Sequence, residues 1–129
     1  MLLPSFHDGY FDGLWLGLNK RAHLFLRTVN GESFVMVLEG VKALVLNEVK
    51  EGNIIFDFAF RSTERIVYAD MEELCAVGSD PRPLVKALDA ANAEGLQILE
   101  LNSSYGAHGL VLFHTWSLSQ REVQPEAKT

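Results

Sequence analysis

The chain has 129 residues, of which 48% are hydrophobic and 22% are charged, a composition typical of a globular domain rather than a disordered chain. A net charge of −6, without any cluster of Lys and Arg, predicts neither a nucleic-acid partner nor an anionic membrane partner. No apolar run reaches the roughly 20 residues that a membrane helix needs. The single cysteine excludes an internal disulfide, and no signal-peptide pattern is found, so the expected location is the cytoplasm.

The first predicted strands form a meander. Residues 10–18 read as a strand, and Gly13 and Gly17 on one face of it suggest a bulge or a large neighbouring side chain packed over bare backbone. A β-hairpin follows directly. At its centre Asn30-Gly31 favours a two-residue type I′ turn, because both residue types accept a positive φ at low cost.

The type of turn decides which side chains of the hairpin share a face. A two-residue loop pairs Leu26 with Val35 and Leu24 with Val37. Both faces are then apolar, so both are expected to need cover from other parts of the structure. One face carries Leu24, Leu26, Val35 and Val37, and the other carries Phe25, Phe34, Met36 and Leu38.

The middle of the chain gives less uniform patterns. Residues 41–49 fit either another strand or an irregular segment at the edge of the sheet. Residues 54–61 alternate strictly between apolar and other side chains, which predicts a half-buried strand. Residues 65–69 are a candidate for one further short strand.

Two helices are predicted between residues 70 and 95. Asp70 is expected to cap a short helix, because a glutamate three residues later completes a capping box. Pro81 is expected to open the main helix, and Gly95 to end it.

The last predicted strands, residues 96–102 and 109–119, form a closing hairpin around a loop at 103–108. Together these elements predict an α+β domain, with an antiparallel sheet of six to seven strands, one main helix and one short helix. Because one helix cannot cover two apolar faces, the sheet is expected to curl toward a barrel, to pack in two layers, or to bury a face in a homodimer. We expect a single domain over residues 1–119 and a disordered tail over 120–129.

The chain shows no recognisable catalytic constellation. His7-Asp8 precedes a strand and lacks the downstream helical ligands of metal-dependent phosphohydrolases. The four histidines have no metal-ligand spacing, and neither a phosphate-binding glycine motif nor a G-x-S-x-G elbow is present. We therefore predict no catalytic residue, no metal and no cofactor, and the sequence leaves open whether the protein is an enzyme.

Short motifs near both ends of the chain point to a set of polar positions. Phe6-His7-Asp8-Gly9-Tyr10 opens the first strand, and Ser104-Tyr105-Gly106-Ala107 lies in the last predicted loop. Over residues 4–119 the chain resembles a group of small uncharacterised bacterial proteins with a His-Asp opening motif, loosely similar to immunity-type proteins of toxin systems. The resemblance implies no established activity, but it singles out His7, Asp8, Tyr10, Ser104 and Tyr105.

Two functions from different classes fit these observations. The leading hypothesis is a noncatalytic protein-interaction module that self-associates as a homodimer and can also bind a protein partner. The alternative is a small hydrolase or ligand-binding protein, whose site combines the N-terminal His-Asp segment with the 103–108 loop. A structural oligomer without a foreign partner is a third reading. The predicted binding residues are His7, Asp8, Tyr10, Ser104, Tyr105 and His108.

Overall fold

The computed structural model describes residues 4–50, 52–61, 68–75 and 82–121. Within these residues, eight strands form one antiparallel sheet in the order β4-β7-β6-β5-β1-β2-β3-β8, with β4 and β8 at its two edges. The α+β class is confirmed, but the expected count of six to seven strands is too low, and the sheet does not close into a barrel. The elements are β1 (Tyr10–Gly17), β2 (Arg21–Arg27), β3 (Ser33–Glu39), β4 (Ala43–Asn47), β5 (Asn53–Arg61), α1 (Tyr68–Cys75), α2 (Arg82–Ala93), β6 (Gln97–Tyr105), β7 (His108–Phe113) and β8 (Thr115–Arg121).

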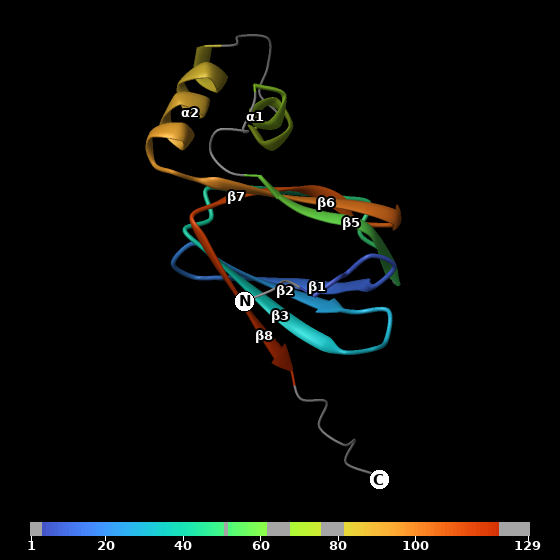
Figure 1. Cartoon of the computed structure of the whole chain (residues 1–129). Helices are drawn as coiled ribbons and strands as arrows, with labels where there is room; N and C mark the ends of the chain where they lie inside the picture. The colour runs from blue at the N-terminus through green and yellow to red at the C-terminus, as the bar shows by residue number, and fades with distance from the viewer. Residues whose placement is uncertain (1–3, 51, 62–67, 76–81, 122–129) are drawn as a thin grey trace.

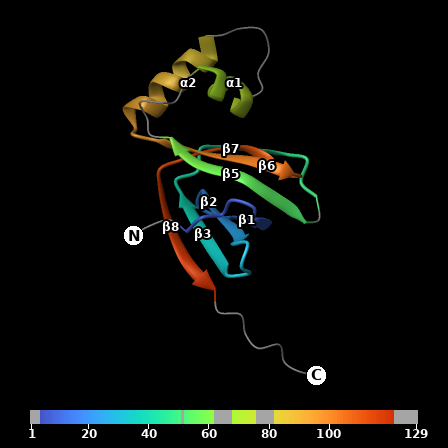
Figure 2. The same cartoon turned by 45° about the vertical axis from the view of Figure 1, so that its right-hand side comes forward.

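The sheet bends into two layers that face each other (Figure 1). We call β4, β7, β6 and β5 the helix-side layer, because α1 and α2 lie over it, and we call β1, β2, β3 and β8 the open layer. Only two residue pairs, Tyr10–Ile54 and Phe11–Asn53, join β1 to β5. The view turned by 45° shows the same stacking of helices, helix-side layer and open layer (Figure 2).

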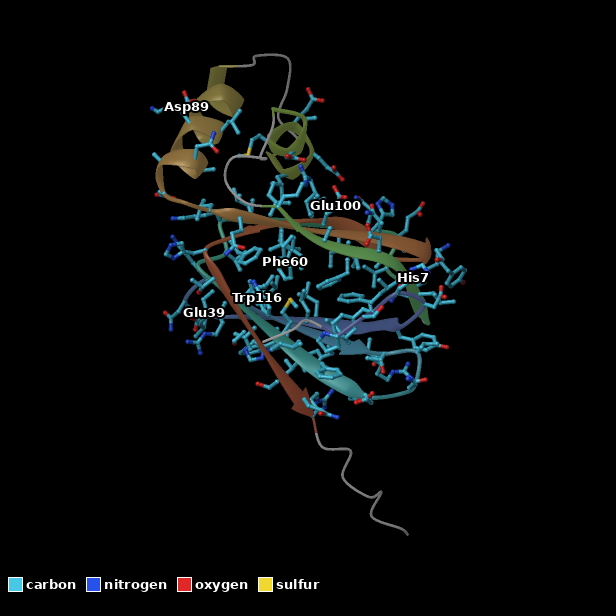
Figure 3. All side chains as sticks on the ribbon, viewed as in Figure 1. His7, Glu39, Phe60, Asp89, Glu100 and Trp116 are labelled. Atoms are coloured by element: carbon cyan, nitrogen blue, oxygen red, sulfur yellow. The ribbon has the colours of Figure 1, made fainter. Side chains whose placement is uncertain are left out.

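A core lies on each side of the helix-side layer. Between the two layers, the ring of Phe60 stacks on that of Trp116 with centroids 4.8 Å apart, and both side chains point into this space (Figure 3). Phe6 packs there as well, at 5.7 Å from the ring of Phe34, so the N-terminal segment helps to fill the inter-layer core. The second core lies between the helix-side layer and the helices, and its buried members are Met71, Ala91, Leu96, Ile98, Leu110 and Leu112.

The β2–β3 hairpin has a different turn from the one predicted. Arg27 pairs with Ser33, and the Gly31 N–H donates to the Thr28 carbonyl at 2.9 Å, so the loop has three residues rather than two. Gly31 has a φ of +89° and Asn30 does not have a positive φ, which corresponds to a type I turn followed by a left-handed glycine. The predicted type I′ turn is therefore wrong, and the predicted pairing of the two strands is off by one residue.

The one-residue change moves every side chain of the second strand to the other face. The buried side chains of the hairpin now share one face, toward the inter-layer core: Ala22, Leu24, Leu26, Phe34, Met36 and Leu38. The opposite face carries half-buried side chains, among them His23, Phe25, Val35 and Val37. Within the described residues the chain buries one face of the hairpin and leaves the other half-buried, so the expected cover is found for one face only.

The first strand confirms the predicted bulge. The pairing of β1 with β2 shifts register between Phe11 and Gly13. Because of this shift Phe11 and Leu14 both point toward the core, although they would lie on opposite faces of a regular strand. The meander of β1, β2 and β3 is confirmed as well.

The predicted strand over residues 109–119 is two strands in different layers. β7 ends at Phe113 and β8 begins at Thr115, and between them the His114 N–H donates to the Glu39 carbonyl at 2.9 Å. Across this corner, the side chains at even-numbered positions change from the core under the helices to the inter-layer core. Leu110 and Leu112 face the helices, whereas Trp116 and Leu118 belong to the inter-layer core together with Val111 and Phe113.

The remaining predictions have mixed outcomes. Residues 43–47 of the ambiguous segment form β4, and β5 matches the predicted strand closely. Helix α1 begins at Tyr68, so Asp70 lies inside its first turn and is not the cap; its carboxylate instead accepts two hydrogen bonds from Arg61. Gly95, with a φ of +70°, ends α2 as predicted. The predicted ends and openings at 76–81, most of the predicted strand at 65–69 and the tail from 122 lie outside the described residues.

Neither described helix has the length and apolar character to cross a membrane.

Candidate functional site

The backbone of the His-Asp segment joins β1 to β5. Asp8 has a φ of +63°, and its N–H donates to the Ile55 carbonyl at 2.9 Å. The Ile55 N–H returns a hydrogen bond of 2.9 Å to the Gly9 carbonyl. The side chains of His7 and Asp8 are both more than half exposed, with His7 Nε2 3.5 Å from Asp8 Oδ2. The main structural role of this motif is thus carried by its backbone.

The second predicted segment is mostly strand rather than loop. β6 continues to Tyr105 and β7 starts at His108, so the turn consists of Gly106 and Ala107 alone. The side chains here engage their near neighbours. Lys50 Nζ lies 5.0 Å from the centre of the Tyr105 ring, and Glu48 Oε2 lies 3.7 Å from His108 Nε2. Ser104 is exposed.

The fold places both segments at the same end of the sheet, on either side of β5. Tyr10 and Tyr105 each pair with Ile54, one from β1 and the other from β6. Two strand spacings, roughly 10 Å, therefore separate their backbones. The Tyr10 ring is contacted by the Arg27 guanidinium at 4.5 Å and not by the 103–108 segment. His7 lies at this end of the sheet in Figure 3.

A buried asparagine at the start of β5, Asn53, holds this end together. Asn53 Oδ1 accepts hydrogen bonds from the N–H groups of Lys50 (2.7 Å) and Ala107 (2.9 Å). Its Nδ2 donates to the carbonyls of Lys50 (2.6 Å) and Phe11 (3.3 Å). All four hydrogen-bonding positions of the amide are occupied, so Asn53 is a structural hub and is not available to a ligand.

The described side chains do not supply catalytic or metal-binding geometry at this end. Among the residues that the structure describes, no group of three or more His, Cys, Asp or Glu side chains could hold a metal ion. Tyr10, Tyr105 and His108 contact Arg27, Lys50 and Glu48, which is a set of local surface contacts rather than a nucleophile aligned with a base.

The outward face of the open layer carries a different set of residues, which we call the outer face. Its centre is apolar and consists of Trp15, His23, Phe25, Val35 and Val37 on three adjacent strands. Trp15 is 53% exposed and meets the His23 ring edge-on at 4.8 Å. The indole also packs over Gly17, where an added Cβ would lie 2.6 Å from it. The predicted packing of a large side chain over bare backbone is therefore found at this glycine.

Arginine residues border the outer face and are held in place. Arg27 Nε and Nη2 donate to the two carboxylate oxygens of Asp12 at 2.6 and 2.8 Å. This hydrogen bonding raises the pKa of the Arg27 guanidinium above its usual value. Arg121 lies over the Phe25 ring at 5.1 Å, and Arg21 donates to Glu39 at 2.8 Å. The charged border is thus a set of ordered contacts rather than free side chains.

A pocket of about 310 Å³ lies between α2 and β4. Its only described charged groups are Lys42 and Glu94, whose Nζ and Oε2 are 3.8 Å apart. Because these two groups face each other, the pocket offers a ligand an apolar lining with few free polar partners. The remaining lining residues are Ala43, Met71, Ala87, Ala90, Ala91, Leu96 and Leu112.

Comparison of the chain with protein-family models, with curated proteins and with solved structures found no match. The resemblance to immunity-type bacterial proteins therefore stays a prediction.

Proposed function

We propose that this protein is a noncatalytic protein-interaction module whose outer face binds a partner protein. The observation that carries the proposal is the coverage of the sheet. The helix-side layer packs against the inter-layer core on one face and against the helices over part of the other, and the open layer is buried on its inward face. Within the described residues, no helix or strand packs over the outer face. Its contiguous apolar side chains are half-buried except for the exposed Trp15, and contiguous apolar patches at a surface are typical of interaction sites.

The composition of the outer face supports a protein as the occupant. Tryptophan, tyrosine and arginine are the residue types most often found at the energetic centres of protein interfaces. Here Trp15 lies on β1 at one side of the outer face, beside His23 of β2, and Arg27 stacks on Tyr10 at one border. Lysine and glutamate, which are depleted from interface cores, are absent from the described centre.

The charges of the outer face indicate the chemistry of the partner. It carries three arginines, Arg21, Arg27 and Arg121, and two carboxylates, Asp12 and Glu39, on a chain whose net charge is −6. Two of the arginines are paired with these carboxylates, whereas the described contact of Arg121 is with an aromatic ring. We infer a partner that presents an apolar patch with a carboxylate placed to meet Arg121, since oppositely charged surfaces favour encounter.

The alternative function, a small hydrolase or ligand-binding protein, has less support. Its site would combine His7 and Asp8 with Ser104, Tyr105 and His108, which lie on opposite sides of β5. General acid–base catalysis requires groups within hydrogen-bond reach of a common substrate atom. The described contacts of Tyr105 and His108 are instead with neighbouring side chains.

The experiment compares two exposed apolar residues, one on the outer face and one off it. Full-length chain is used to capture partners from the native cell, and the captured protein is then purified and titrated against Trp15→Ser and Leu18→Ser. Leu18 is 89% exposed and lies in the turn after β1, so it is a matched control. We expect Trp15→Ser to weaken binding about 30-fold and Leu18→Ser to change it less than about twofold. Equal effects of the two substitutions would refute the assignment of the outer face.

The expected homodimer is part of this proposal, but the outer face is not the surface that favours it. If two copies paired through this face, each would present three arginines and two carboxylates to the other, so two surfaces of the same net charge would meet.

A further inference from the structure

The two edges of the sheet differ in how well they are protected against another strand. Natural edge strands are blunted by charged or polar side chains, prolines or bulges, because their unpaired backbone groups can pair with a second chain. β8 follows this rule, since Thr115, Ser117, Ser119, Gln120 and Arg121 are polar and exposed. β4 does not follow it. Its sequence is Ala-Leu-Val-Leu-Asn, and the four apolar side chains are each only half-buried.

Both faces of β4 are apolar, but its free edge has no described strand partner. Leu44 and Leu46 pack against the inter-layer core, and Ala43 and Val45 pack against the core under the helices. On its paired side β4 meets β7 over its whole length. An added strand would therefore extend both cores, and on the helix side it would border the pocket beside Ala43.

We infer that two copies of this chain pair antiparallel through β4, in the register that places Val45 opposite Val45 of the second copy. The charges that flank the strand select the occupant and the register. Lys42 directly precedes β4 and Glu48 directly follows it. Two-fold antiparallel pairing centred on Val45 brings Lys42 of each copy beside Glu48 of the other, twice in the dimer. Between these contacts Leu44 lies opposite Leu46, so the strand is complementary to itself in shape and in charge.

The same two residues cannot pair within one chain. They flank the five residues of β4, which alone span roughly 17 Å at the rise of a β-strand, and Glu48 turns out of the strand with a φ of +55°. Inside the monomer Lys42 contacts Glu94, and Glu48 contacts His108. Any energetic coupling between Lys42 and Glu48 must therefore act between copies.

The test uses sedimentation equilibrium of the full chain over a wide range of micromolar concentrations. The wild type is expected to reach twice the chain mass of 14.4 kDa. Lys42→Glu and Glu48→Lys should each raise the dissociation constant about tenfold, because two symmetric contacts change from attraction to repulsion. The double variant K42E/E48K should restore the dimer. It retains the new repulsion between residue 42 and Glu94, so recovery cannot come from that contact.

Three results would overturn the inference. They are a wild-type protein that stays monomeric throughout, single variants that dimerise like the wild type, and a double variant that dimerises no better than the single ones. Trp15→Ser serves as the control and should leave the dimer unchanged. A monomeric wild type would therefore refute the β4 dimer without refuting partner binding by the outer face. Equal effects of Trp15→Ser and Leu18→Ser on partner binding would likewise leave the β4 dimer unaffected.

Discussion

Replacing Asn53 by alanine should destabilise the protein more than any other single amide truncation among the described side chains. The substitution removes four hydrogen bonds and creates a cavity at the junction of β1, β5 and the turn before β7. Two of the backbone groups that lose a partner, the Ala107 N–H and the Phe11 carbonyl, belong to residues that are at most 2% exposed. Lys50 is exposed, so water can replace the lost bonds there.

The expected loss follows from the two buried groups. Leaving one buried backbone group unsatisfied costs about 1–3 kcal/mol, so the free energy of unfolding should fall by about 4 kcal/mol. Such a loss is a large part of the stability of an ordinary domain. The matched control is Asn102→Ala, which removes one 3.1 Å hydrogen bond from a half-buried amide to Glu100 and should cost less than about 1 kcal/mol.

The assay is urea unfolding of each full-length variant, followed by far-ultraviolet circular dichroism. The midpoint should fall strongly for Asn53→Ala and slightly for Asn102→Ala, with an unchanged slope for both. Equal midpoints for the two variants would refute the role of Asn53 as the hub of this end of the sheet. A changed slope would show that Asn53 acts through the unfolded state instead.

Three further predictions can be tested by the same unfolding measurements. Arg61→Met should lower the free energy of unfolding by about 3 kcal/mol, because it removes the two hydrogen bonds to the largely buried Asp70 carboxylate. Arg21→Met breaks an exposed pair and should cost less than about 1 kcal/mol, so equal losses would contradict this prediction. Gly106→Ala should lower the free energy of unfolding far more than Gly31→Ala. Both glycines have a φ near +90°, but an added Cβ would meet Asn53 Oδ1 at Gly106 and nothing at Gly31. Similar losses of stability would show that backbone strain alone decides both. Trp15→Ser should change the free energy of unfolding by less than about 1 kcal/mol while it weakens partner binding, and a large loss of stability would instead indicate a structural role for this side chain.

The sequence predicted the elements with strong local patterns. The alternation in β5 and the glycine that ends α2 were each sufficient on their own. The register of β2 and β3 was missed because Asn-Gly fits both a two-residue and a three-residue loop. The polar residues gave the information that decides between them. Arg21, Arg27 and Ser33 all occupy odd-numbered positions, and only a three-residue loop places these positions of both strands on one face.

The corner at His114 had no comparable local pattern. Leu110, Leu112, Trp116 and Leu118 keep one alternation with only His114 between them, so the sequence reads as one strand. The bend depends on contacts with distant segments, namely the Glu39 carbonyl and the side chain of Gln97, which donates to the His114 carbonyl at 3.0 Å. The predicted site combined His7 with Tyr105 without fixing where the two segments lie. The structure places them at one end of the sheet on opposite sides of β5, an arrangement that depends on strand order rather than on a local pattern.

The most direct test of the central claim, that the outer face binds a partner protein, is photo-crosslinking in the native cell. A photoreactive phenylalanine analogue is placed at Val35, in the centre of the outer face, or at Asp89, on the exposed side of α2 (Figure 3). We expect an adduct of one distinct protein from Val35 that disappears with Trp15→Ser, and no such adduct from Asp89. The absence of an adduct at Val35, the same adduct from both positions, or an adduct of two copies of this chain at Val35 would contradict it.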